Sequence, residues 1–192
     1  MQKDRLTAFS DGVIAVIITI MVLELAPPRG ANLHALAAVL GPFSIYALSF
    51  VYIAIYWNNH HHFFQLVRKV NGAILWANLN LLFWLSLIPF ATAWMGANLF
   101  VAVPTALYGV ALLLPALSWN VMQIAIIRAQ GADSPLARAI GADLKGKTTA
   151  FLYFVGIGVS FMQPPVADAL YAGVALIWLV PDKRVEALLG EA

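Results

Sequence analysis

The sequence predicts an all-α integral membrane protein whose single domain, residues 1–192, contains six transmembrane helices. Two observations support this fold class. Of the 192 residues, 62% are hydrophobic and only 10% are charged, which is far from the balance of a soluble protein. The apolar residues also form uninterrupted segments close to the roughly 20 residues that a membrane-spanning helix needs.

Prolines and polar residues divide the apolar sequence into six segments. Pro27-Pro28 follows the first, and the second contains no charged residue. An uncharged run of 58 residues, 70–127, divides at 96–98 into the third and the fourth, and the fourth is long enough to kink, tilt or extend beyond the membrane. The expected segments are Leu6–Leu25, Leu36–Trp57, Gly72–Trp94, Leu99–Ile127, Thr148–Gln163 and Val166–Val180.

The last two segments are short for membrane spans, so a shallow hairpin is the alternative to a fifth and sixth crossing. Residues 133–145, which precede them, are polar with spaced leucines and alanines. This composition predicts an interfacial helix or a surface loop.

The basic residues predict the orientation. With six spans, ten of the eleven Lys and Arg residues fall on the side of both termini, and only Arg29 falls on the other. Because basic residues gather on the cytoplasmic side, both termini are expected in the cytoplasm of a multi-pass protein of the cell inner (plasma) membrane. Four spans with a hairpin would give the same orientation. Asp11 interrupts what would be the apolar core of a signal peptide, so the first segment is expected to be retained.

Composition also excludes several classes of function. The chain has no cysteine, which excludes disulfides and thiolate chemistry, and its net charge of +2 is too small to indicate a nucleic-acid partner. No combination of nucleophile, base and metal ligands indicates an enzyme, and no cofactor or metal site is expected.

Asp11 is a charged residue inside the first apolar segment, where an ionised group costs several kcal/mol. Successive helical residues turn by about 100°, so Gly12, Val16, Ile20 and neighbouring residues share one narrow stripe, while Asp11 lies about 140° from Val16. If the stripe lined a pore, Asp11 would point back into the protein. We therefore expect Asp11 to hold helices together through hydrogen bonds.

The stripe has an ordinary interpretation as well, since small and branched residues at helical spacing more often pack against another helix than line a pore. Thr19 alone does not change this, because a membrane threonine can bond its own backbone. Glu24, at the outer end of the helix, fits either a cation-concentrating pore mouth or an ordinary solvated interface residue.

Polar residues on the second and third helices are candidate partners of Asp11. Three adjacent histidines, residues 60–62, suggest a metal site, but neighbours on a helix point about 100° apart, so a hydrogen-bonding cluster at the cytoplasmic interface is favoured. Asn78 lies near the cytoplasmic start of its helix, at the depth of Asp11. Their similar depth in the membrane makes a hydrogen-bonding network plausible, although it does not say which residues pair. Its members would be Arg5, Ser10, Asp11, Trp57, His60 or His61, and Asn78.

Arg5, followed after three residues by Phe9-Ser10-Asp11, resembles the signature that opens the first helix of the transmembrane protein 175 family of potassium channels. The resemblance extends to about residue 90, nearly half of the chain, and the later helices resemble the family only in number and hydropathy. The other matching residues are Gly12-Val13, Ala15, Thr19, Leu23, Trp57, His60, His61, Asn78 and Pro89-Phe90.

The resemblance implies a homotetramer of six-helix chains in which four first helices line a central pore without a re-entrant selectivity loop. Val16 would form the narrowest apolar constriction, with further rings at Ile20 and Leu23, and Thr19 would form a polar layer linked to potassium preference. Phe9, Ser10 and Asp11 would belong to the structural network that supports the pore helices.

The expected function is therefore passive conduction of potassium, the permeant ion, with membrane lipid and copies of the chain itself as partners. A ring of aliphatic side chains excludes water when it is narrow and admits hydrated ions when it widens, which makes it a hydrophobic gate. The alternative is a proton- or sodium-coupled secondary transporter that uses Asp11, Glu24 and the histidines. A non-conducting scaffold also remains open.

Overall fold

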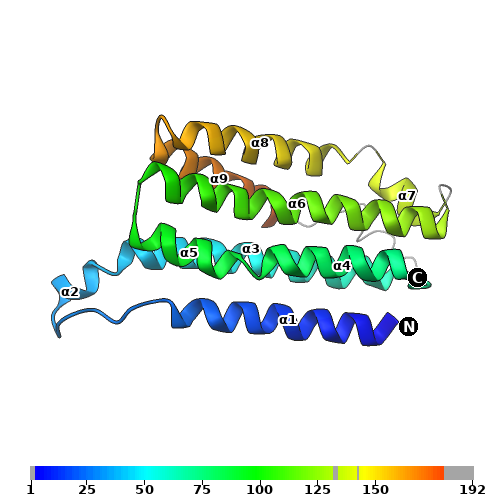
Figure 1. Cartoon of the computed structure of the whole chain (residues 1–192), viewed down its shortest axis with the longest axis horizontal. Coiled ribbons are helices and arrows are strands. Elements are labelled where there is room, and N and C mark those ends of the chain that lie inside the picture. The colour runs from blue at the N-terminus through cyan, green and yellow to red at the C-terminus, as the bar shows by residue number, and fades with distance from the viewer. Residues whose placement is uncertain (1–2, 132–133, 142, 180–192) are drawn as a thin grey trace.

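The computed structural model describes residues 3–131, 134–141 and 143–179, and within these residues the regular structure is entirely helical. Four long segments and a final hairpin run back and forth along the longest axis of the molecule (Figure 1). The helices are α1 (Lys3–Leu23), α2 (Leu33–Ala37), α3 (Leu40–Gln65), α4 (Gly72–Leu85), α5 (Ile88–Ala97), α6 (Ala102–Gln130), α7 (Pro135–Ile140), α8 (Leu144–Ser160) and α9 (Pro164–Leu179).

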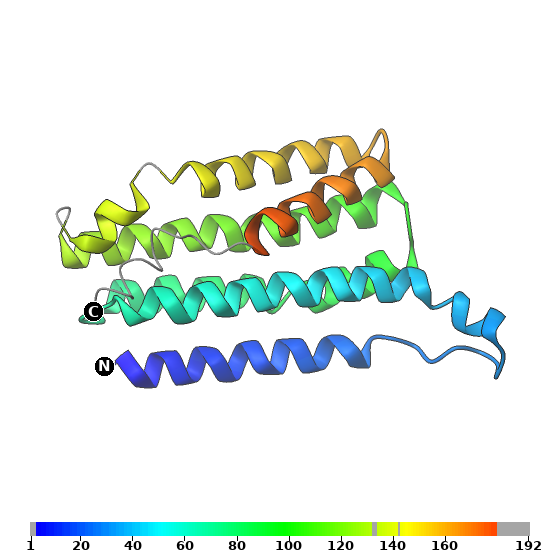
Figure 2. The ribbon, with the colours of Figure 1, turned by 180° about the vertical axis from the view of Figure 1, so that it is seen from behind.

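The helices form a bundle with α1 at one edge and α8 at the opposite edge, and the view from behind shows the same order (Figure 2). The start of α1 and the short helix α7 lie at one end, which we call the α7 end. Helix α2, the start of α6 and the turn between α8 and α9 lie at the other end, the α2 end. Helix α1 packs against α3, α4 and α5.

Four segments are long and apolar enough to cross a membrane: α1, α3, α4 with α5, and α6. Helices α8 and α9 have 17 and 16 residues and fall short of the usual span. They run antiparallel to each other beside α6 (Figure 1). A full crossing by both helices stays a prediction, as does the shallow hairpin.

The helix boundaries differ from the expected ones by a few residues at nearly every end, and the second long helix also continues to Gln65, eight residues beyond the expected Trp57. The second long helix begins at Leu40 rather than Leu36, because the Asn32 side chain accepts a hydrogen bond from the Ala35 backbone N–H (2.8 Å) and starts a separate helix, α2. The third segment divides into α4 and α5 just before Pro89, which has no N–H with which to continue the helical hydrogen bonds. The expected end of the last helix, Val180, lies outside the described residues.

The fourth segment and the stretch after it agree more closely with expectation. Helix α6 has 29 residues and continues through Pro115. Within 133–145, the residues that the structure describes form the six-residue helix α7, whose first backbone groups are capped by Ser134 (3.2 Å to the Ala137 N–H), and the start of α8. Asp133 and Ala142 lie outside the described residues.

The buried face of α1 determines which way the other side chains of that helix point. Leu6, Ser10, Ile14, Ile17 and Met21 are each at most 4% exposed and recur every three or four residues. In a membrane, this face is held against the other helices by van der Waals packing and interhelical hydrogen bonds, because the lipid acyl chains are as apolar as the helix itself. The opposite face of α1 points away from the bundle.

Candidate functional site

The outward face of α1 carries the stripe expected from the sequence. Val16 is 54% exposed, Ile20 43% and Leu23 80%, while Gly12 and Thr19 are also exposed. No other described segment of the chain covers this face. The helical phase therefore places these five residues on one open surface, which we call the α1 open face.

A groove of about 770 Å³ runs between the α1 open face and α5. Phe9 and Val16 contribute to it from α1, and Pro89 and Phe90 contribute from α5. Phe9 is 54% exposed and Phe90 64% exposed, so large apolar side chains line a space that the chain does not fill itself. An apolar hollow of this kind marks a surface that another apolar body can occupy.

Thr19 is the polar residue of the α1 open face. Its hydroxyl donates a hydrogen bond to the Val16 carbonyl (2.9 Å), which is a bond within its own helix. The hydroxyl proton is therefore directed at the backbone, and the oxygen keeps an acceptor lone pair for a group outside. A hydroxyl oxygen of this kind can accept contact from a cation.

Glu24 follows the last residue of α1 and is exposed. It borders the groove and also a second cavity of about 540 Å³ at the α2 end, which has Arg29, His34 and Thr92 in its wall. Two hollows of the surface thus meet at one carboxylate.

Behind the α1 open face, three fully buried polar side chains join α1, α4 and α3. The Asn78 amide N–H donates to the Ser10 hydroxyl (2.9 Å), and His60 Nε2 bonds the Asn78 amide oxygen (2.8 Å). Ser10 in turn donates to the Leu6 carbonyl (2.9 Å). Each of the three residues is at most 1% exposed, so these bonds are shielded from competing groups.

Asp11 takes part in a separate and more accessible interaction. Trp57 on α3 donates its indole N–H to the Asp11 carboxylate (3.0 Å), and the Trp57 ring stacks on His61 with ring centres 6.0 Å apart. His61 also shares a hydrogen bond with Gln65 (2.9 Å). The carboxylate is thus directed at α3, not at the α1 open face.

The expected network is therefore divided into two parts. Ser10, His60 and Asn78 form one part, and Asp11, Trp57 and His61 form the other. Arg5 and Phe9 are exposed and lie outside both sets of hydrogen bonds among the described residues. Within the same residues, no group of three or more His, Asp or Glu side chains is placed to hold a metal ion.

The structure also contains a buried set of hydroxyls that was not expected from the sequence. Thr92 on α5 shares a hydrogen bond with the Ser49 hydroxyl (2.7 Å), and Ser49 on α3 shares another with the Tyr108 hydroxyl of α6 (2.8 Å). Helix α9 carries a partly buried acidic residue, Asp168, that was also not singled out from the sequence. An acidic residue inside the sixth apolar segment is the same signal that drew attention to Asp11, so the sequence offered a means of finding it.

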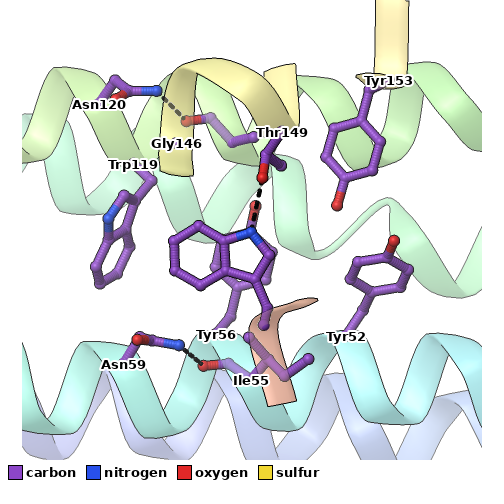
Figure 3. Close-up of a pocket in the computed structure, with 11 residues that line it drawn as sticks. Tyr52, Ile55, Tyr56, Asn59, Trp119, Asn120, Gly146, Thr149 and Tyr153 are labelled. Atoms are coloured by element: carbon purple, nitrogen blue, oxygen red, sulfur yellow. Dashed lines mark hydrogen bonds between the residues drawn. The ribbon is translucent and has the colours of Figure 1, made fainter. Parts of the chain in front are cut away.

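A small aromatic cavity lies deeper in the bundle, between α3, α6, α8 and α9 (Figure 3). Tyr52 and Tyr153 point toward one another across one side, and Trp119 lies on the other (Figure 3). Its volume is about 40 Å³, which holds only a few water molecules, and no residue of α1 lines it. It is therefore separate from the α1 open face and too small for an ion path through the chain.

Comparison with known proteins gives matches along the whole chain. The family described as endosomal/lysosomal potassium channel TMEM175 matches residues 5–89. A Chryseobacterium species (strain P1-3) has a protein, named as a potassium channel, that is 52% identical over 191 residues and covers all of both chains. A Streptomyces collinus protein with the same description is 30% identical and covers 92% of this chain and 91% of its own length.

A solved structure matches the fold as well. The crystal structure described as a lysosomal potassium-selective channel TMEM175 homolog from Chamaesiphon minutus superposes with a TM-score of 0.83 at 25% identity. The match covers 94% of this chain and 97% of that one. Sequence and structure together show that this chain belongs to the TMEM175 family.

Proposed function

We propose that this chain is a potassium-preferring cation channel that conducts passively through a pore lined by the first helices of four copies. The relatives at 52% and 30% identity are both named as potassium channels. The observation that carries the proposal is the α1 open face, an apolar helix surface with one hydroxyl layer and no covering segment among the described residues.

The assembly follows from what the single chain leaves open. The groove between α1 and α5 offers apolar space beside Phe9 and Val16 to a neighbouring copy, so adjacent copies can pack at α1. The number four comes from the family resemblance. In such a ring the α1 open faces would surround the axis, and the Ser10–Asn78–His60 hydrogen bonds would hold each α1 at a fixed rotation.

Gating and selectivity would lie at different levels of the same helix. Rings of Val16, Ile20 and Leu23 would exclude water when narrow and admit hydrated ions when the helices rotate or splay. Four Thr19 hydroxyls, with their protons directed at the backbone, would replace part of the hydration shell of the ion. Few oxygens are available in such a layer, so its selectivity would be modest. Glu24 would concentrate cations at the mouth.

Charge supports an orientation for the channel. Of the Lys and Arg residues that the structure describes, all but one lie at the α7 end, and Arg29 alone lies at the α2 end. We infer that the α7 end is cytoplasmic, with both termini inside and six crossings in a single domain 1–192 of the cell inner membrane. The residues at the α7 end are Lys3, Arg5, Arg68, Lys69, Arg128, Arg138, Lys145 and Lys147.

Selectivity gives the direct test. Purified protein in liposomes should pass potassium down its gradient without a coupled ion, and Thr19→Ala should move the potassium-to-sodium permeability ratio toward one. Thr7→Ala is the matched control, because Thr7 bonds its own helix at Lys3 (3.2 Å) but lies on the other side of α1. An unchanged ratio in Thr19→Ala refutes the role of Thr19. Absence of potassium flux in the unsubstituted protein across a wide range of voltage and pH refutes the channel itself.

The coupled transporter makes the opposite prediction at Asp11. The carboxylate accepts from Trp57 and is turned away from the open face, and an asparagine oxygen can accept the same indole N–H. Asp11→Asn should therefore leave passive potassium flux largely intact. A transporter that uses Asp11 as its ion site would lose coupled, saturable flux in this variant, and that result would favour it over the channel.

A further inference from the structure

The aromatic cavity of about 40 Å³ lies where α8 and α9 pack on α3 and α6 (Figure 3). Eleven residues line it, none of them carries a charge, and nearly all of the wall is apolar. At about 10–15 Å³ for each water-sized sphere, the space holds about three such spheres, which is room for one small molecule. Five of the lining residues are aromatic: Tyr52, Tyr56, Trp119, Tyr153 and Trp178.

Several polar groups of the wall are bonded to other parts of the protein. The Tyr52 hydroxyl donates to a backbone carbonyl of α9, and the Trp178 indole N–H donates to the Thr149 hydroxyl (2.7 Å). Asn59 and Asn120 direct their amide N–H groups at carbonyls of their own helices (2.8 and 2.9 Å). A buried water molecule needs about two to four polar partners, so this wall is poorly suited to hold water.

The walls also keep the space open. Tyr52 meets Tyr153 edge to face with ring centres 6.2 Å apart, and Tyr56 meets Trp119 in the same way at 6.3 Å. At the α8 wall, a side chain on Gly146 would collide with the carboxylate that caps the helix, so this position cannot fill the cavity. A space that is already formed binds a ligand without the cost of opening it.

Charge decides the class of ligand. Aromatic faces can attract a cation, but no carboxylate lines this cavity, so a cation would lack a counter-charge inside a membrane protein. The Lys145 ammonium lies 4.3 Å from the centre of the Trp178 ring, where it would repel a second cation. A neutral apolar molecule meets neither penalty, and empty apolar cavities in proteins take up xenon and small hydrocarbons.

We propose that this cavity is a binding site for one small, uncharged, apolar molecule of about the size of a xenon atom, held by van der Waals contact with the aromatic rings. Ile55 on α3 and Trp178 on α9 are half-buried lining residues, so the ligand enters between these two helices. Four helices contribute to the wall, so an occupant should stabilise the packing of α8 and α9 on α3 and α6. The site is separate from the α1 open face and does not rest on potassium conduction.

Crystals of the full chain under xenon pressure test the site, because xenon scatters X-rays anomalously and can be located. The unsubstituted protein should show an anomalous peak in contact with Trp119 and Tyr153. Ala116→Val adds two methyl groups at the wall and should reduce the xenon occupancy at least severalfold. Ala111→Val is the matched control, because Ala111 lies on the same helix outside the wall, and it should keep the peak.

Ile55→Ala tests the apolar class in solution and does not depend on how the filled variant folds. Losing three carbon atoms from the wall enlarges the cavity, so this variant should bind benzene at least severalfold more tightly than the unsubstituted protein. Its midpoint of thermal unfolding should therefore rise more steeply with benzene concentration. Ile177→Ala is the control, because Ile177 is exposed on α9 outside the wall, and it should behave as the unsubstituted protein does.

Four results would overturn the site. Absence of the xenon peak, or an equal peak in Ala116→Val, shows that xenon does not occupy the cavity. Electron density that continues from the cavity to the surface between α3 and α9 assigns the space to a lipid acyl chain. Equal responses to benzene in Ile55→Ala and the unsubstituted protein contradict an apolar site. Stabilisation by methylammonium that is lost in Ala116→Val assigns a cation site instead.

Discussion

Replacing Asn78 with leucine tests whether the buried amide holds α1 in place. Asn78 bridges α1 and α3 through Ser10 (2.9 Å) and His60 (2.8 Å), and its side chain is 1% exposed. Leucine has the same number of side-chain heavy atoms with the same branching, but none of them is polar. The main change is therefore the loss of two interhelical hydrogen bonds and the exposure of His60 to an apolar neighbour.

The structure allows the size of this effect to be estimated. Interhelical hydrogen bonds in membrane proteins average about 0.6 kcal/mol each, so two bonds amount to about 1.2 kcal/mol. A buried donor left without a partner costs about 1–3 kcal/mol. Ser10 keeps its bond to the Leu6 carbonyl, so His60 is the group left unpaired. Asn78→Leu should lower the free energy of unfolding by about 1–3 kcal/mol.

The assay is reversible unfolding in mixed micelles, followed by circular dichroism. Asn80→Leu is the matched control on the same helix, because Asn80 is exposed and bonds Ser118 on α6 (2.8 Å), away from α1. Asn80→Leu should lower the free energy of unfolding by less than Asn78→Leu does. In a double-mutant cycle with His60→Phe, which keeps an aromatic ring beside Phe64, the double variant should lose less than the sum of the two single variants. Equal effects at Asn78 and Asn80, or strict additivity in the cycle, would refute the reasoning.

Two further substitutions test the packing of α8 against α9 and the proposed pore-lining position of Val16. Gly156→Ala places a methyl group against the Tyr171 ring and should destabilise the fold by about 1–3 kcal/mol, whereas Gly158→Ala, with open space around it, should be neutral or stabilising by up to about 1 kcal/mol. Equal unfolding free energies for the two variants would contradict the packing. Because the chain has no native cysteine, Val16→Cys should make the conductance sensitive to a thiol-reactive reagent, while Ile14→Cys, 1% exposed on the buried face, should not. Insensitivity of Val16→Cys would contradict the pore-lining position of Val16.

The rotation of α1 could be predicted from the sequence because it depends on local geometry. Helical phase alone separates Asp11 from Val16, and the structure shows Asp11 bonded to Trp57 while Val16 lies exposed. The pairs within the polar network could not be predicted, because Ser10 and Asn78 are 68 residues apart and meet only through helix packing. The depth of each residue in the membrane can be predicted from the sequence, but which helices are neighbours cannot.

Local signals explain the remaining differences. Asn32 is a strong helix-capping residue, and it starts the short helix α2 a few residues before Leu36, where the second long helix was expected to begin. The buried set of hydroxyls that includes Ser49 has no sequence signature, because serine and threonine in membrane helices usually bond their own backbone. Thr92 also bonds the backbone of its own helix, at the Ile88 carbonyl (2.7 Å). Only tertiary structure shows that it also reaches Ser49.

The short helices α8 and α9 have a consequence for the lipid around the protein. At 1.5 Å per residue, 17 and 16 residues extend only about 25 Å, while the hydrocarbon layer measures about 30 Å. If these helices cross, the bilayer must become thinner beside α8, where Phe151 and Phe154 are exposed to it. The protein would then experience hydrophobic mismatch beside α8, and lipids with shorter acyl chains would stabilise it.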